Sequence, residues 1–108
     1  MIKLFANKNT KDVNVKDLDQ LIGSIELIDI REPYEYRSGS IKTAVNIPMG
    51  MLLEDPEQYL EKDQTYYIIC HSGRRSRSTV ELLEKQGYDV INVAGGVSSY
   101  KGAHGQRV

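Results

Sequence analysis

Hydrophobic and polar residues are arranged along the chain in short blocks that predict strands and helices in alternation. Runs of β-branched and other apolar residues predict buried strands at 25–30, 44–47, 66–70 and 90–93. Helical spacing and helix-start residues predict helices at 14–22, 31–38 and 74–86, with one or two short helices in 49–63 and another ending near Tyr100. This order predicts an α/β fold with a central, mostly parallel sheet flanked by helices.

The boundaries of the predicted helices carry residues that suit those positions. Asn14 can cap the start of the first helix, and Gly23 can end it. Pro33 suits the first turn of the second helix, and Gly87 suits the end of the longest one. The polar segment 101–108 has no such signals, and we expect this C-terminal tail to be flexible.

Length and composition fit a single domain that spans residues 1–108. A chain of 108 residues with 40% hydrophobic residues can bury one core and is too short for two. No run reaches the roughly 20 apolar residues needed to span a bilayer. The apolar run at the N-terminus is also too short for a secretory signal. We therefore expect a cytoplasmic protein with no membrane partner, present as a monomer or a weak dimer.

Charge and cysteine content exclude several functions. The net charge of −1 gives no general attraction to nucleic acid, so we expect no such partner. A single cysteine cannot form an internal disulfide, and with only two histidines beside it we expect no metal site. We also expect no cofactor. If Cys70 reacts covalently, a molecule from outside must complete the reaction, because the chain has no second thiol.

The candidate chemistry lies where Cys70 ends a predicted strand and opens a loop, residues 70–76, into the longest helix. Ligands of open α/β sheets bind at such junctions. The N–H groups of the loop and of the helix start can converge on an anion, and such a site stabilises a thiolate. Gly73 allows the loop to close tightly. Cys70 is therefore the candidate nucleophile. The candidate substrate-binding residues are His71, Ser72, Gly73, Arg74, Arg75 and Ser76.

Arginines gather at the start of the same helix. Arg74, Arg75 and Arg77 place positive charge where it opposes the helix dipole, which costs stability unless an anion binds there. Guanidinium groups bind tetrahedral oxyanions through paired hydrogen bonds. The pattern therefore favours an anionic substrate.

Each of these features also has a purely structural interpretation. A lone cysteine after an apolar strand is commonly an inert, buried residue, and clustered arginines are commonly solvated surface. The glycine and arginines that follow Cys70 favour a functional role, because an inert core position needs no such loop. His71 could be a general base or a metal ligand, but we expect it only to line the mouth of the pocket.

The loop resembles the active-site pattern C-x-x-G-x-R-S of the rhodanese family of sulfurtransferases. The matching residues are Cys70, Gly73, Arg75 and Ser76. Other family landmarks follow in the same order: a strand with a D-x-R-E turn, a G-H-I-P-G-A-x-N-I-P segment and a G-G-[IV] segment. They correspond to residues 27–36, 39–48 and 95–97. The resemblance covers about residues 13–100 and implies the three-layer rhodanese-like domain.

The sequence departs from the family pattern outside the loop. Ser40, Lys42 and Thr43 stand where the family usually has His, Pro and Gly, and Tyr100 stands where Trp is common. These departures affect loop conformation and the partner surface more than the chemistry.

The resemblance implies ping-pong sulfur transfer. Cys70 would take the outer sulfur of a donor such as thiosulfate, hold it as a persulfide and pass it to cyanide or a thiol. The implied partners are a small sulfur-containing anion and a thiol or a protein persulfide. Loop N–H groups would hold the terminal sulfur while Arg74 and Arg75 orient the donor. We further expect Asp29 and Arg31 to brace neighbouring loops through a buried ionic contact.

Two other functions stay open at this point. The domain could be a persulfide carrier or binding module with little turnover on free thiosulfate, because a carrier uses the same cysteine. It could also be a small phosphatase or arsenate reductase, whose pattern C-x5-R has a longer loop. Here four residues separate Cys70 from Arg75, which favours a single sulfur atom over a phosphoryl group.

Overall fold

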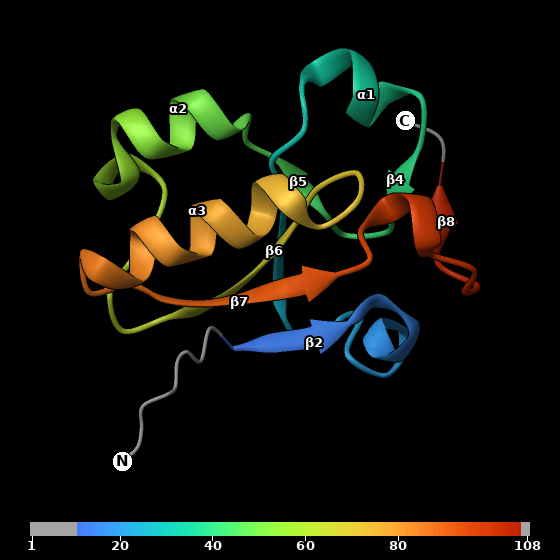
Figure 1. The fold of residues 1–108 in the computed structure, drawn as a ribbon. Helices are drawn as coiled ribbons and strands as arrows, with labels where there is room; N and C mark the ends of the chain where they lie inside the picture. The colour runs from blue at the N-terminus through green and yellow to red at the C-terminus, as the bar shows by residue number, and fades with distance from the viewer. Residues whose placement is uncertain (1–10, 107–108) are drawn as a thin grey trace.

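A computed structural model of the chain, which describes residues 11–106, contains a five-stranded parallel sheet (Figure 1). The strands lie side by side in the order β2-β7-β6-β3-β5, and every neighbouring pair is parallel. Their bounds are Asp12–Asn14 (β2), Glu26–Asp29 (β3), Val45–Asn46 (β5), Thr65–Ile69 (β6) and Asp89–Ala94 (β7). The predicted α/β fold with a central parallel sheet flanked by helices is confirmed.

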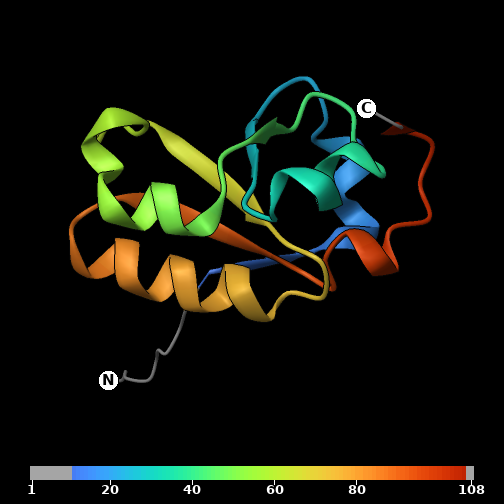
Figure 2. The same ribbon diagram turned by 90° about the horizontal axis from the view of Figure 1, so that it is seen from above.

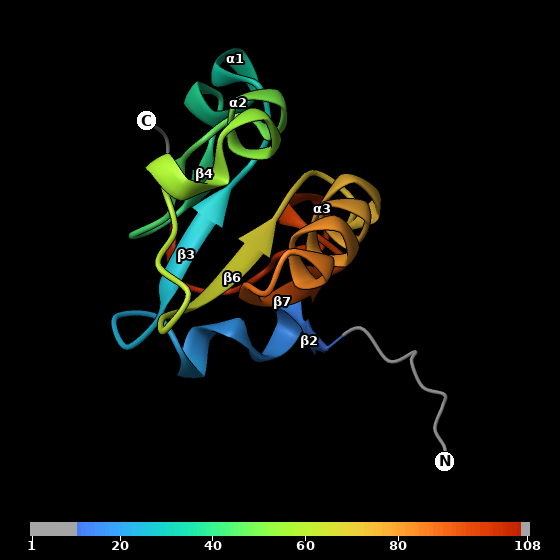
Figure 3. The ribbon, with the colours of Figure 1, turned by 90° about the vertical axis from the view of Figure 1, so that its left-hand side faces the viewer.

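Helices cover both faces of this sheet (Figures 2 and 3). The α-helices are Pro33–Arg37 (α1), Met49–Glu54 (α2) and Arg74–Lys85 (α3). The 3-10 helices are Val15–Gln20 (η1), Pro56–Gln58 (η2) and Val97–Ser99 (η3). Helices α2 and α3 lie together over one face, and η1 lies on the other. Within residues 11–106, no helix is both long and apolar enough to cross a membrane.

Two apolar clusters fill the spaces between these layers, because successive side chains of a strand point to opposite faces. Ile28, Ile68 and Val90 pack under α2 and α3 in the first cluster, together with Leu52, Val80 and Leu83 from those helices. The second cluster, on the face of η1, includes Val15, Leu18, Leu27, Ile69 and Val93. Burial on both faces explains why the central strands are apolar at consecutive positions.

The predicted elements are present, and most of their ends differ from the prediction by one or two residues. Gly23 and Gly87 both adopt positive φ, and Asn14 accepts a hydrogen bond from the Lys16 amide as the cap of η1. However, η1 is a 3-10 helix and is shorter than predicted. The sequence analysis also did not predict β2. Only three residues long, it is held at the edge of the sheet by parallel pairing with β7.

The segment after Lys101, where we expected a flexible tail, makes specific contacts as far as Gln106. Strand β8, Gly105–Gln106, pairs antiparallel with β4, Ser40–Ile41. The Lys42 amide donates a hydrogen bond to the carbonyl of His104, with an N–O distance of 2.6 Å. A proline at position 42, as the family pattern has it, could not donate this bond. The departure at Lys42 therefore permits the contact that anchors this segment.

Thr43, which replaces a glycine of the family pattern, is strained. Its φ is +74°, and within the described residues it is the one non-glycine residue with positive φ. A β-branched side chain is disfavoured there, because its Cβ substituents crowd the backbone. The turn between β4 and β5 thus keeps the backbone conformation that a glycine would adopt freely.

We predict that Thr43→Gly raises the free energy of unfolding by about 1 kcal/mol, because it removes this strain. Urea denaturation of the two proteins measures the difference. Thr43→Ala, which keeps a Cβ at positive φ, is the matched control and should recover little of the gain. An unchanged or lower stability of Thr43→Gly would contradict the strain.

Candidate active site

The thiol of Cys70 is held by backbone amides at the start of α3. Its Sγ accepts hydrogen bonds from the amide of Gly73 at 3.1 Å and from that of Ser76 at 3.3 Å. The hydroxyl of Ser76 lies 3.4 Å from the same sulfur and donates to the carbonyl of Gly73. Cys70 is only 1% exposed, so nearly all of its contacts are with the protein. The amides point inward at the sulfur, as the sequence analysis expected.

Further amides at the start of α3 have no partner within the helix. The first N–H groups of an α-helix have no partner within the helix, and in α3 these include the amides of Arg74 and Arg75. They surround the end of the helix dipole that favours negative charge. The arrangement suits an anion that extends from Sγ, such as the outer sulfur of a persulfide.

Gly73 and Gly96 allow the loop of residues 70–76 and the segment of residues 94–98 to pack closely against each other. Gly73 has a φ of +100°, and a Cβ there would lie 3.1 Å from the amide nitrogen of Gly95. Gly96 has a φ of +64°, and a Cβ there would lie 2.6 Å from the carbonyl oxygen of Cys70 and closer still to that of His71. Only glycine fits at Gly96, because the obstructing atoms belong to the backbone.

That close approach allows the start of η3 to hold the loop through hydrogen bonds. The amide of Val97 donates to the carbonyl of Cys70, and the amide of Ser98 donates to that of His71. Both N–O distances are 2.9 Å. The G-G-[IV] landmark of the sequence thus supports the loop of residues 70–76. Its place in the structure explains a motif that the sequence analysis recorded without a role.

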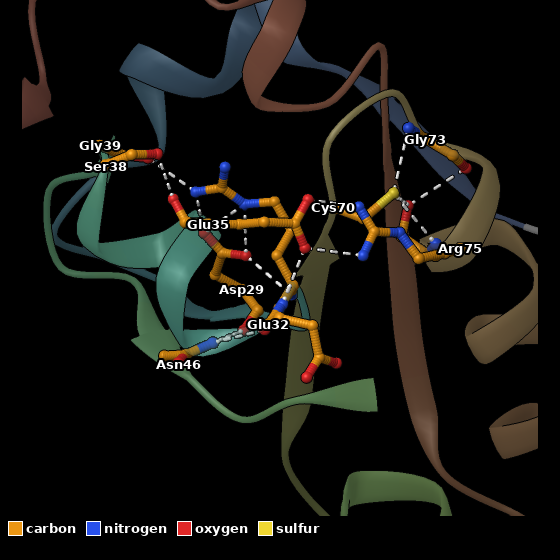
Figure 4. A network of polar contacts seen from close by, with 11 residues as sticks. Asp29, Glu32, Glu35, Ser38, Gly39, Asn46, Cys70, Gly73 and Arg75 are labelled. Atoms are coloured by element: carbon orange, nitrogen blue, oxygen red, sulfur yellow. Dashed lines mark hydrogen bonds and ion pairs between the residues drawn. The ribbon is translucent and has the colours of Figure 1, made fainter. Parts of the chain in front are cut away.

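The three arginines of α3 have different surroundings, and Figure 4 shows those of Arg75. Arg75 forms a bidentate ion pair with Glu35 of α1, with N–O distances of 2.9 and 3.0 Å. Arg77 pairs with Asp12 of β2 at 2.8 Å. Arg74 is exposed and, with Arg77, borders an open cavity of about 360 Å³ on the side of β7. The expected excess of positive charge is thus largely matched by carboxylates of the protein itself.

The remaining candidate residues of the loop lie at its surface. His71 and Ser72 are exposed, and Ser72 borders the cavity beside Arg74. His71 contributes its carbonyl to the support from η3. Within residues 11–106, no group of three or more His, Cys, Asp or Glu side chains is placed to hold a metal ion.

Asp29 and Arg31 form a buried ionic contact at the end of β3, as expected. The guanidinium of Arg31 donates to both carboxylate oxygens of Asp29, and its NH2 group also donates to the carbonyl of Gly39 at 2.7 Å. Asp29 further accepts from the hydroxyl of Ser40 at 2.6 Å. Both charged side chains are almost fully buried. The pair therefore ties the end of β3 to the start of β4.

The carboxylate of Glu35, which the sequence analysis did not single out, is well supplied with donors. Besides the two bonds from Arg75, it accepts the backbone amide of Glu32 at 2.9 Å as part of a capping box. The hydrogen bonds from Arg75 are the main reason that its pKa falls from 4.5 to about 2. The spacing of Glu32 and Glu35 was the one available signal, since a glutamate at the third helical position is typical of a capping box.

Comparison with known proteins matches residues 14–103 to the family described as Rhodanese-like domain, and the chain belongs to this family. A Bacillus subtilis protein whose name includes the word sulfurtransferase, YtwF, is 39% identical over 95 residues, which cover 85% of this chain and 91% of that protein. YrkF of the same organism, whose name includes the words sulfur carrier protein, is 40% identical over 80 residues. That match covers 73% of this chain and 43% of YrkF.

Solved structures agree with this assignment. The crystal structure of a rhodanese-like domain protein from Staphylococcus aureus superposes with a TM-score of 0.81 at 29% identity. It covers 92% of this chain and 99% of the other. The fold and the family expected from the resemblance are thus confirmed.

We predict that the stability contributed by Glu35 disappears in acid. Its pKa is lower in the folded protein, so its contribution is complete above the ordinary value of 4.5 and is lost as the pH falls toward about 2. For this partly exposed pair we expect the free energy of unfolding of the wild type to exceed that of Glu35→Gln by about 1 kcal/mol at pH 7. The difference should approach zero near pH 2. Urea denaturation at several pH values measures this difference in the free energy of unfolding. A difference that does not change with pH would contradict the contribution of the ion pair.

Proposed function

We propose that this protein is a sulfurtransferase that carries a sulfane sulfur on Cys70, from a small anionic donor such as thiosulfate to a thiol or cyanide. The observation that supports it best is the pair of amide hydrogen bonds to Sγ, from Gly73 and Ser76. Amides arranged in this way favour negative charge on the sulfur without reorganising during the reaction. Membership of a family with relatives named as sulfurtransferases supports the same reaction class.

In the first half-reaction, the Cys70 thiolate attacks the outer sulfur of thiosulfate. A new S–S bond forms to Cys70, and the old S–S bond breaks. Sulfite leaves with the electron pair of that bond, so one sulfur atom stays on Cys70 as a persulfide anion. Charge is conserved, and no oxidant or reductant is needed. The amides at the start of α3 are suited to hold the terminal sulfur that carries the charge.

In the second half-reaction, an acceptor thiolate or cyanide attacks the terminal sulfur. The S–S bond to Cys70 breaks, the Cys70 thiolate is regenerated, and the acceptor leaves as a persulfide or as thiocyanate. An external acceptor is required because the chain contains no second cysteine that could resolve the persulfide. Cyanide would serve as the acceptor in an assay, and a cellular thiol is the acceptor we propose in the cytoplasm. A protein persulfide would instead act as a donor to Cys70.

The length of the loop disfavours a phosphatase or arsenate reductase. Only four residues separate Cys70 from Arg75, so the loop is shorter than the C-x5-R pattern requires. A loop of this length is no obstacle to holding a single sulfur atom.

A sulfur carrier is the second candidate, and the similarity to YrkF favours it. A carrier would form the same persulfide but receive its sulfur from another protein. Steady-state rates with thiosulfate, compared with rates of sulfur uptake from a protein persulfide, distinguish the two roles. Rapid turnover on thiosulfate indicates an enzyme, and uptake only from the protein donor indicates a carrier.

We predict that intact wild-type protein gains the mass of one sulfur atom after incubation with thiosulfate and loses it again on addition of cyanide. Cys70→Ser should gain no mass and produce no thiocyanate, while its circular dichroism spectrum stays that of the wild type. Mass spectrometry measures both results. Wild-type protein that gains no sulfur from thiosulfate or from a protein persulfide would contradict the proposal.

A further inference from the structure

Arg75 is the arginine of α3 that reaches toward α1, and its guanidinium forms a two-bond ion pair there. Both of its terminal nitrogens donate to Glu35, one to each carboxylate oxygen. This parallel, two-bond geometry is the one by which guanidinium groups bind oxyanions. Figure 4 shows the Arg75 side chain extending from the catalytic loop past Cys70 to Glu35. We call this ion pair the latch.

The latch is electrostatically coupled to the thiol. The pKa of Arg75 is raised, first by its hydrogen bond to Glu35 and then by the charges of Glu35 and Cys70. A negative charge on Cys70 therefore acts directly on this guanidinium. Because Cys70 itself is 1% exposed, a reagent can reach the sulfur only if neighbouring groups move.

Glu35 is fixed in place by its own helix. The amide of Glu32 donates to the same oxygen, Oε1, that binds Arg75. Its carboxylate therefore acts as an internal oxyanion, and it occupies the two-bond position on Arg75 that the sulfonate group of an anionic donor would need. The face of Arg75 that points at Glu35 is available to a donor only after Glu35 has been displaced.

We propose that Glu35 determines donor specificity by competing with the donor's oxyanion for Arg75. This inference rests on the proposed sulfur transfer. A donor with a multiply charged tetrahedral oxyanion, of the thiosulfate class, can replace Glu35 on Arg75 and so open the latch beside Cys70. Neutral sulfur compounds do not bind Arg75, and weakly charged anions cannot displace Glu35 from it. When the sulfite product leaves, Glu35 returns to Arg75 and closes the latch.

Three variants separate the pairing of Glu35 from its charge. Glu35→Asp keeps the charge but is one methylene too short to bind both nitrogens of Arg75. Glu35→Gln removes the charge and the pairing together. Glu32→Gln is the matched control, because it removes a charge from the same helix start and leaves the Arg75 pair intact. Thermal unfolding confirms that each variant is folded at the assay temperature.

The readout is the rate of Cys70 alkylation by iodoacetate, an anion, divided by the rate with neutral iodoacetamide. This ratio needs no sulfur transfer. In Glu35→Asp and Glu35→Gln we expect it to rise about three- to fivefold, the factor that corresponds to a partly exposed ion pair. In Glu32→Gln we expect it to stay at the wild-type value. The KM for thiosulfate should fall in the two Glu35 variants and stay unchanged in the control.

A ratio that rises in Glu35→Gln and Glu32→Gln but not in Glu35→Asp would overturn the proposal, because charge alone would then explain access. Unchanged ratios in both Glu35 variants would also overturn it. The variants could show the expected ratios while the wild-type protein takes up no sulfur from any donor. That result would support the latch and reject the proposed sulfur transfer. The two claims can therefore fail separately.

Discussion

The contact between the Cys70 sulfur and the amides of Gly73 and Ser76 is the interaction on which the rest of the site depends. A sulfur this deeply buried is normally a weakly interacting, apolar group. Here the end of a central strand places it at the start of a twelve-residue helix, where unpaired N–H groups converge. The proposed sulfur chemistry rests on this contact, because converging N–H groups favour negative charge on the sulfur.

The surrounding structure holds that contact from three sides. Behind the loop, η3 binds the carbonyls of Cys70 and His71, and Gly96 makes this approach possible. Beside it, Glu35 of α1 binds Arg75. Below, the buried Asp29–Arg31 pair fixes the end of β3, next to the strand that carries Cys70. The site is therefore assembled from segments distant in sequence, each contributing one backbone or ionic contact.

Local patterns predicted the elements and the nucleophile, and long-range contacts account for what was missed. Strand β6 and helix α3 have strong apolar periodicity, and the residues from Cys70 to Ser76 are contiguous, so their geometry followed from sequence. Strands β2 and β8 are only three and two residues long, and pairing with their neighbours is what makes them strands. Glu35 lies 40 residues from Arg75, and no local pattern reports that pairing. The sequence indicated that the arginines of α3 bind an anion. It could not show that carboxylates of the protein itself, those of Glu35 and Asp12, are bound to two of them.

The most direct test of the account is the ¹H–¹⁵N spectrum of the protein before and after sulfur is loaded onto Cys70. If the amides at the start of α3 hold the sulfur anion, the signals of Gly73 and Ser76 are already shifted downfield relative to Cys70→Ser. When the persulfide forms, the largest changes in amide chemical shift should occur at residues 71–76. Sulfur loading that leaves these amide signals unmoved, while signals elsewhere change, would contradict the account.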